Sequence, residues 1–338
     1  MKNALRTLVG MAASLLVGAT WASAQTGTVP QLGHVFIVVG ENASFSQTYQ
    51  SGAMPYLDSL AGKYGLAINY ISDTHGSDFN YFVLSSGQEL TFNPTPDPAT
   101  TSFTVDNIAL DLQNAGKTWK EYVENIDSSC GGLINGAYDP YHDPFVYYTN
   151  VNQGNRVCFS QFAADLKNHT LPNLSWLSPN VCDEAHNTCN GATLANMDNW
   201  LKTEIAPLLA SSYFQPGGDG LLVITFDEDE FTGGTFCSTS QIESGTWCGG
   251  QVETVVISPL AKSGYQSSNE YHDENVLRLF EEALGLTEFP GASSDPNKVL
   301  SPPIDMADFF TAAAPVVSLS PTSWSAGKRS SAKTSCAS

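Results

Sequence analysis

The chain has 338 residues, a formal net charge of -20 at pH 7, and a hydrophobic content of 42%. This length and apolar content support a folded domain with a substantial core and exclude disorder over most of the chain. The acidic surface excludes nucleic-acid binding through a basic patch, because it repels phosphate backbones. Any anionic substrate must therefore meet a local positive charge, of which a bound cation is the simplest source.

The first residues have the pattern of an export signal. Lys2 and Arg6 supply positive charge, Leu8 to Thr20 is a short apolar run, and Ala22 to Ala24 is a small-x-small cleavage site. We therefore predict a signal peptide over residues 1–24, a mature chain that starts near Gln25 with a charge of -22, and secretion to the periplasm or the exterior. An N-terminal membrane helix is the alternative, but the run is short and lacks a basic stop-transfer flank. No later stretch is long and apolar enough to span a bilayer.

In chain order, three short β-branched apolar runs predict buried strands, and helical periodicity between them predicts helices. The strands are His34 to Gly40, Leu221 to Phe226 and Val252 to Ser258. The helices are Tyr56 to Tyr64, Val105 to Ala115, Leu194 to Ala210 and Glu274 to Leu284. Strands that alternate with helices indicate an α/β fold, with a mainly parallel central sheet covered on both faces as a three-layer α/β/α sandwich.

Three stretches have the composition of irregular structure. Asn93 to Thr104 is predicted to be a surface loop, and Ser128 to Asn155 an irregular insertion tied by a disulfide. Residues 315–338 are predicted to be a flexible tail, which leaves residues 25–314 as one domain.

Six of the seven cysteines form close pairs in sequence, which predicts local disulfides in an exported chain. The pairs are Cys130 with Cys158, Cys182 with Cys189, and Cys237 with Cys248, and Cys336 stands alone in the tail. Zinc binding by thiolates is the competing interpretation, but the chain has no CxxC spacing.

Acidic and amide side chains follow two of the predicted strands directly. Glu41 and Asn42 follow the first strand, and Asp227 and Glu228 follow the second. In parallel sheets ligands bind outside the carboxyl ends of the strands. Either group could be a solvated loop, but two of them at one edge favour a cation site, because the carboxylates would otherwise repel one another.

The segment THGSDFNYFVLSSG, residues 74–87, contains the candidate nucleophile Ser77. A serine hydroxyl needs a base or a metal to become nucleophilic, and His75 and Asn80 could supply an imidazole and an amide donor. The alternative is a polar loop before a helix, with Ser77 or Asp78 as the N-cap. A protease or lipase triad is disfavoured because the chain has no GxSxG elbow.

Four of the six histidines lie in predicted loops beside acids or amides, the usual environment of a metal or phosphate site. They are His75, His142, His186 and His272, whereas His34 and His169 are assigned to structure.

Four segments together resemble the phosphoesterase family of secreted acid phosphatases and bacterial phospholipases C, within the alkaline-phosphatase-like superfamily. They are VGENASFSQTY (39–49), THGSDFNYFVLSSG (74–87), SPNVCDEAHN (178–187) with YHDPF (141–145), and ITFDEDE (224–230) followed by VVISPL and YHDENVLRLFEEALGL (271–286). The resemblance extends from about residue 32 to residue 310.

The resemblance implies a role for each matching residue. Ser77 matches the nucleophile of the family's THPSxPNY segment, with His75 and His186 as further catalytic residues. Asn80, His142 and His272 match substrate-binding positions. The implied ligands of a divalent metal ion are Glu41, Asn42, Asp227 and Glu228, and the histidines could add a second metal site.

The chain departs from the family pattern at three places. Gly76 and Phe79 replace two prolines near Ser77. Either Asp183 or Glu184 can occupy the acidic position of the third segment, and either His272 or Asp273 the histidine position before the last helix.

We predict a secreted metal-dependent acid phosphatase that hydrolyses small phosphomonoesters through a phosphoserine. The alternatives are a phospholipase C-type phosphodiesterase and a secreted binding protein that has lost catalysis.

Overall fold

The structure is a computed structural model, and the residues that it describes are 28–91, 93, 95–127, 130, 138–186, 189, 193–230, 246–287, 290 and 305–311. The predicted signal peptide, the predicted tail, Cys237 and Cys336 lie outside these residues, so the predictions about them remain predictions. No helix in the described ranges has the length and apolarity needed to span a membrane.

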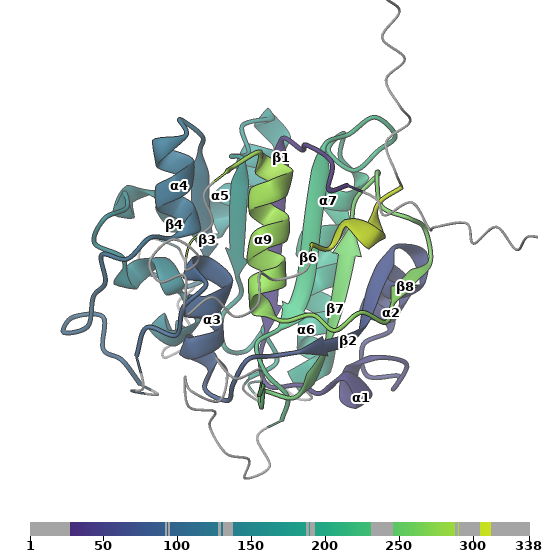
Figure 1. Cartoon of the computed structure of the whole chain (residues 1–338), viewed down its shortest axis with the longest axis horizontal. Helices are drawn as coiled ribbons and strands as arrows, with labels where there is room; N and C mark the ends of the chain where they lie inside the picture. Colours follow the sequence, from purple (N-terminus) through teal and green to yellow (C-terminus); the bar gives the residue numbers. More distant parts are fainter. Residues whose placement is uncertain are drawn as a thin grey trace, which may run out of the picture.

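One eight-stranded sheet forms the centre of the molecule (Figure 1), in the order β4-β3-β5-β1-β6-β7-β2-β8. All neighbouring strands pair in parallel except β7, which runs antiparallel to both of its neighbours. The prediction of a mainly parallel sheet is therefore confirmed. The strands are β1 (His34–Gly40), β2 (Gly65–Ile71), β3 (Trp119–Val123), β4 (Arg156–Cys158), β5 (Leu174–Ser178), β6 (Gly220–Phe226), β7 (Gln251–Ile257) and β8 (Tyr265–Ser267).

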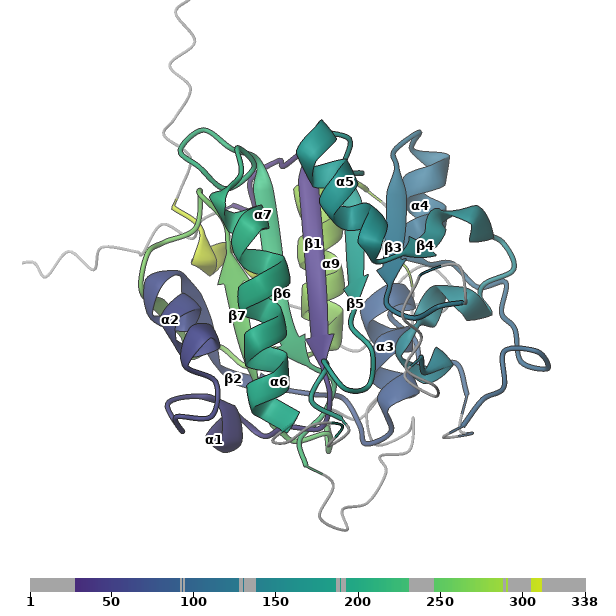
Figure 2. The same cartoon turned by 180° about the vertical axis from the view of Figure 1, so that it is seen from behind.

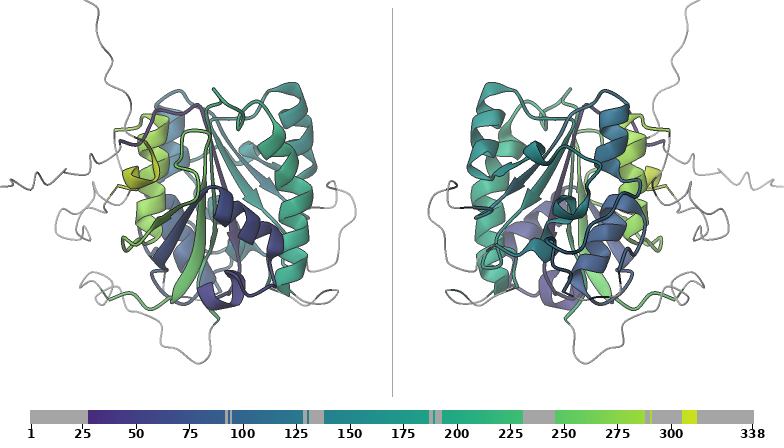
Figure 3. Two further views of the ribbon diagram at one scale, coloured as in Figure 1. Left: turned by 90° about the vertical axis from the view of Figure 1, so that its right-hand side faces the viewer. Right: turned by 90° about the vertical axis from the view of Figure 1, so that its left-hand side faces the viewer.

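Helices cover both faces of this sheet, as the three-layer prediction requires. Helices α3, α4 and α9 lie on the face toward the viewer in Figure 1, and α2, α5, α6 and α7 lie on the opposite face (Figures 2 and 3). The helices are α1 (Phe45–Thr48), α2 (Pro55–Lys63), α3 (Ser77–Ser86), α4 (Ile108–Asn114), α5 (Ser160–Asn168), α6 (Thr193–Trp200), α7 (Ala206–Ala210) and α9 (Asp273–Leu284).

Burial explains why the central strands consist of continuous apolar runs. Every residue of β6 is buried, and in β1 only His34 is partly exposed. A strand that is covered on both faces cannot alternate between polar and apolar residues. The last position of β1 is Gly40, and it has no room for a side chain because a Cβ there would lie 2.6 Å from the sulfur of Met197.

The long helix predicted over residues 194–210 is interrupted. A π-helical turn, Leu201–Ile205, separates α6 from α7. Pro207 accounts for the break, because it has no N–H to donate to the carbonyl four residues earlier. The helix predicted from Val105 begins instead at Ile108, where the side chain of Asn107 caps it by accepting a hydrogen bond from the Leu110 N–H at 3.0 Å.

The insertion predicted over residues 128–155 is irregular in its described part. It contains the short 3-10 helices η2 (Pro140–His142), η3 (Pro144–Tyr147) and η4 (Gln153–Asn155). Disulfides join Cys130 to Cys158 and Cys182 to Cys189, which confirms two of the three predicted pairings.

Candidate functional site

The acidic groups predicted at the strand ends lie together at one edge of the sheet. β1 lies between β5 and β6 and is parallel to both, so the segments that follow these three strands emerge side by side. Backbone hydrogen bonds join them: Glu41 N–H donates to the Glu184 carbonyl at 2.7 Å, and Asp227 N–H donates to the Gly40 carbonyl at 2.9 Å. The edge therefore brings together carboxylates that are nearly 190 residues apart in sequence.

Ser77 is the first residue of α3, which begins at the same edge beyond β2. Gly76 precedes it with a φ of 103°, a conformation that favours glycine. The Ser77 hydroxyl donates a hydrogen bond to Glu41 Oε2 at 2.8 Å. The candidate nucleophile and a strand-end carboxylate thus share one site.

Glu228 connects three of the loops that build the site. One oxygen accepts hydrogen bonds from His75 Nδ1 at 2.7 Å and from the Gly76 N–H at 2.8 Å. The other accepts from the side-chain amide of Asn42 at 2.6 Å, and the Asn42 N–H donates to Asp227 Oδ1 at 2.9 Å. Both oxygens of Glu228 are therefore engaged in hydrogen bonds, whereas Asp227 Oδ2 is buried without a hydrogen-bond partner.

His142 lies between two buried glutamates. Its Nε2 is 3.4 Å from Glu41 Oε2, and its Nδ1 is 2.7 Å from Glu184 Oε1. The closer pair is a buried ion pair when His142 is protonated. One ligand atom from each of Glu41, His142 and Glu184 lies within 4.8 Å of the other two. Buried nitrogen and oxygen atoms at this spacing fit a divalent transition-metal ion.

Burial and mutual repulsion control the charge of this site. Burial raises the pKa of Glu41 well above its usual range, and Asp227 raises it further. Burial and the neighbouring Glu228 raise the pKa of Asp227 to about 7. Burial lowers the pKa of His142, but Glu184 and Glu41 outweigh that effect and raise it well above its ordinary value. Cations and protons therefore compete for the same carboxylates.

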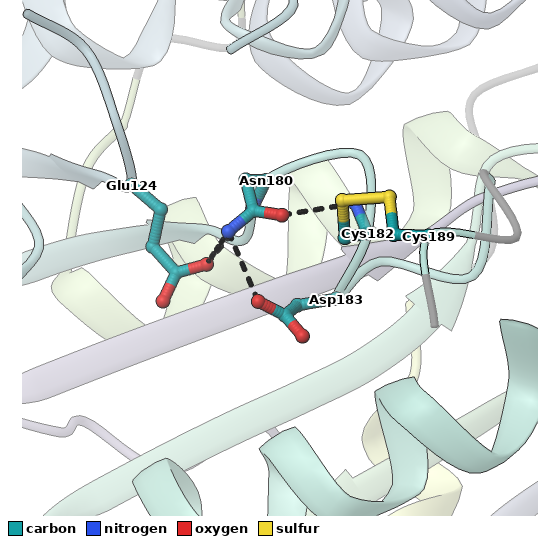
Figure 4. The surroundings of a disulfide bond; sticks show 5 residues. All are labelled: Glu124, Asn180, Cys182, Asp183 and Cys189. Atoms are coloured by element: carbon teal, nitrogen blue, oxygen red, sulfur yellow. Dashed lines mark hydrogen bonds between the residues drawn. A yellow bond between two sulfur atoms is a disulfide. The ribbon is translucent and has the colours of Figure 1, made fainter. Parts of the chain in front are cut away.

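The adjacent acids Asp183 and Glu184 occupy different places in the structure. Glu184 faces His142, whereas Asp183 accepts a hydrogen bond from the Asn180 amide at 3.0 Å (Figure 4). The same amide group donates to Glu124 at 2.8 Å, and the Cys182–Cys189 disulfide closes the loop beside it. Glu184 is therefore the acid that faces the site.

Two other predicted residues, Asn80 and His186, lie beside the residues described above. The Asn80 side chain exchanges two hydrogen bonds with the Thr74 backbone and so fixes the turn before Ser77. The His186 ring is exposed and lies 5.6 Å from the His142 ring, centroid to centroid. Their roles in catalysis or binding remain predictions.

His272 lies apart from the group around Ser77. Its Nδ1 donates to the Ile71 carbonyl at 2.7 Å, and its ring stacks on Trp247 at 3.7 Å. Its neighbour Asp273 accepts a hydrogen bond from the Tyr70 hydroxyl at 2.7 Å. Within the described residues, His272 makes no hydrogen bond or ion pair with another predicted site residue, and its substrate-binding role remains a prediction.

Tyr81 is a site residue that the sequence analysis missed. Its hydroxyl donates to Glu41 Oε1 at 2.7 Å, and its ring stacks on His142 with centroids 5.6 Å apart. It lies one helical turn after Ser77, so both side chains reach Glu41 from the same face of α3. That four-residue spacing was the available signal.

Comparisons with known proteins identify the family of the chain. The model of the Phosphoesterase family matches residues 36–287. A phosphatidylinositol-3-phosphatase from Mycobacterium tuberculosis is 27% identical over 87% of this chain and 92% of its own length. An acid phosphatase from Aspergillus fumigatus is 31% identical over 55% of this chain, but the match spans only 42% of that protein.

A solved structure supports the fold. A protein of the alkaline phosphatase superfamily from Vibrio parahaemolyticus superposes with a TM-score of 0.54 at 12% identity, covering 77% of this chain and 69% of its own. The family match covers most of the chain and includes Glu41, Ser77, Glu184 and Asp227. The chain belongs to the Phosphoesterase family and is a hydrolase of phosphoric ester bonds.

Proposed function

We propose that this protein is a metal-dependent phosphomonoesterase of the acid phosphatase type, with Ser77 as its nucleophile. The observation that supports this most is the 2.8 Å hydrogen bond from Ser77 to Glu41 at a buried acidic edge. Among the described residues, no lysine or arginine forms an ion pair with Glu41, Glu184, Asp227 or Glu228. A phosphate dianion can approach these carboxylates only if a cation neutralises them.

Glu41, His142 and Glu184 would hold this cation, because one ligand atom of each lies within 4.8 Å of the other two. Asp227 would add its buried Oδ2, which has no hydrogen-bond partner among the described residues. Asn42 and Glu228 belong to the metal site through their hydrogen bonds, and Asn42 could add a direct ligand. When bound, a divalent ion lowers the pKa of a hydroxyl and neutralises phosphoryl oxygens.

The residues of the chain account for the proton movements. Glu41 accepts the proton of Ser77 as the serine oxygen forms a bond to phosphorus and the bond to the leaving alcohol breaks. The proton that the alcohol takes away comes from His186, whose exposed ring lies 5.6 Å from that of His142, centroid to centroid. Water then cleaves the phosphoserine, which returns free serine and inorganic phosphate.

Ser77→Ala tests the nucleophile, and Ser85→Ala is its matched control. Ser85 lies on the same helix, but its hydroxyl pairs with Tyr148 and with the Tyr81 carbonyl, away from Glu41. We expect Ser77→Ala to abolish release of p-nitrophenol from p-nitrophenyl phosphate, and Ser85→Ala to keep it. A Ser77→Ala protein with near wild-type turnover would refute the assignment.

The same assay separates the substrate classes. The mycobacterial relative is named as a phosphatase of phosphatidylinositol 3-phosphate, which is a monoester borne on a lipid. We therefore expect activity on p-nitrophenyl phosphate and on vesicles that contain this lipid, and little on bis(p-nitrophenyl) phosphate. A preference for the diester would favour the phosphodiesterase alternative, and bound metal without hydrolysis would favour the binding protein.

We also infer that the chain is exported. The two disulfides are of the kind that persist in oxidising compartments. N-terminal sequencing of the mature protein should begin near Gln25, and an intact N-terminus on the secreted protein would contradict the proposed cleavage.

A further inference from the structure

A buried cluster of ion pairs includes Asp143, the residue that follows His142. Arg156, on the edge strand β4, donates from Nε to Asp143 Oδ1 at 3.0 Å and to Glu121 at 3.2 Å. Its Nη2 pairs with the other oxygen of Asp143, which also accepts from the Tyr138 hydroxyl at 2.7 Å. The Arg156 side chain is only 11% exposed, and the carboxylates of Asp143 and Glu121 are buried. Asp143 is therefore held from several directions.

Stability alone does not account for this cluster. Buried ion pairs can often be replaced by apolar residues at no cost, because the loss of hydration offsets the attraction between the charges. A guanidinium offers something else, since its planar fork fixes a carboxylate in both position and orientation. Arg156 therefore fixes the position and the orientation of the Asp143 carboxylate.

The geometry that it fixes is that of the segment carrying His142. Asp143 follows His142 directly and separates η2 from η3. Its side chain reaches back to β4, while the His142 ring reaches forward to Glu41 and Glu184. The Cys130–Cys158 disulfide fastens an earlier part of the same insertion to the end of β4, two residues from Arg156. The Arg156–Asp143 ion pair and the disulfide therefore both attach the insertion to β4.

We propose that Arg156 is a positioning residue that holds His142 between Glu41 and Glu184 by clamping Asp143 with its guanidinium fork. The proposal rests on the proposed function only in that it gives His142 a part in the reaction. Arg156 itself does not touch the substrate.

The test compares Arg156→Lys and Arg156→Met with Lys120→Met as the matched control. Lys120 lies on the neighbouring strand β3 and pairs with Asp165 at 2.6 Å, away from the His142 segment. We expect both Arg156 variants to lower kcat about 10- to 100-fold with little change in KM, as loss of an outer-shell partner does. Lys120→Met should keep kcat within about twofold of wild type, because its ion pair does not reach His142.

Two further measurements keep the test decisive. Histidine side-chain NMR, with the His142 signal identified by its loss in His142→Asn, should show that signal shifted in Arg156→Lys and unshifted in Lys120→Met. This readout holds even if the wild type hydrolyses no phosphate ester, so failure of the proposed function is distinguishable. If Arg156→Met does not fold, Arg156→Lys and the isosteric Asp143→Asn are compared with Lys120→Met instead. An unmoved His142 signal with wild-type kcat in Arg156→Lys, or an equal loss of kcat in Lys120→Met, would overturn the proposal.

Discussion

Replacing Tyr81 with phenylalanine removes one hydroxyl from the centre of the site and nothing else. That hydroxyl donates to Glu41 Oε1 at 2.7 Å, and both side chains are buried. Burial raises the pKa of Glu41, and the hydrogen bond from Tyr81 opposes this rise. A hydrogen bond to a charged group is worth about 1.5–3 kcal/mol. Its loss should therefore raise the pKa of Glu41 further, because this hydrogen bond no longer favours the carboxylate over the neutral acid.

The consequence should appear in the pH dependence of kcat/KM. In the proposed mechanism Glu41 must be ionised to accept the Ser77 proton, so the acid limb of the profile should move to higher pH in Tyr81→Phe. Below that limb, the rate should fall about 10- to 100-fold relative to wild type, and well above it the two proteins should converge. Hydrolysis of p-nitrophenyl phosphate between pH 4 and pH 9 measures the shift.

Tyr148→Phe is the matched control for this experiment. Tyr148 is also buried, and its hydroxyl lies 2.8 Å from that of Ser85 on the same helix as Tyr81. Because that hydrogen bond is between neutral groups, its loss should cost about 1 kcal/mol of stability without moving the profile. If the acid limb of Tyr81→Phe coincides with that of wild type and only stability falls, Tyr81 is structural and the reasoning about Glu41 is wrong.

Three further predictions concern buried acids. Among the residues that the structure describes, neither oxygen of Glu281 has a hydrogen-bond partner, and burial raises the pKa of Glu281 from 4.5 to about 10. The stability of the native protein should therefore fall as the pH rises through this range. Urea unfolding should show that Glu281→Met has a larger unfolding free energy than wild type. That difference should increase by up to about 4 kcal/mol between pH 4.5 and 7.5, and a difference independent of pH would contradict the prediction. Glu184→Gln should weaken binding of a divalent ion at least about tenfold in calorimetry, while Asp183→Asn should not; equal losses would exclude a special place for Glu184. After chelation, the thermal stability of the protein should fall from pH 4 to about pH 7, because Asp227 stays protonated when folded but ionises when unfolded, and a saturating divalent ion should remove that slope.

The sequence predicted the strands with a run of apolar residues and missed those without one. β1 and β6 were found because burial on both faces leaves a nearly uninterrupted apolar run, and β7 because Val255 to Ile257 are apolar although Glu253 is buried before them. β3 contains Glu121, which is fully buried, and β5 contains two buried serines. Glu121 is tolerated there because Arg156, 35 residues later, pairs with it. Local periodicity cannot show such a partner, so these strands gave no signal.

A similar limit applies to the site. The position of acids directly after strands predicted that Glu41 and Asp227 would meet, because parallel strands end at one edge. The choice between Asp183 and Glu184 depended on a turn in which Ala185 has a φ of 83°, closed by the Cys182–Cys189 disulfide. Two adjacent carboxylates of similar chemistry give no local reason to prefer either one. The conformation of the loop decides which of them faces His142.

Several carboxylates lie close together at this edge, so we expect both the stability of the protein and its affinity for a cation to depend on pH. Burial and the neighbouring carboxylates raise the pKa values of Glu41 and Asp227, so a proton or a cation must offset the negative charge there. In the site proposed above, protons compete with the cation, and we expect the affinity for the cation to fall as the pH falls. In the absence of a cation, burial lowers the pKa of His142, but Glu184 and Glu41 outweigh that effect and raise it, and the hydrogen bond to Glu228 raises the pKa of His75. In the proposed site the cation takes the place of the proton on His142, because a metal ion binds the neutral imidazole.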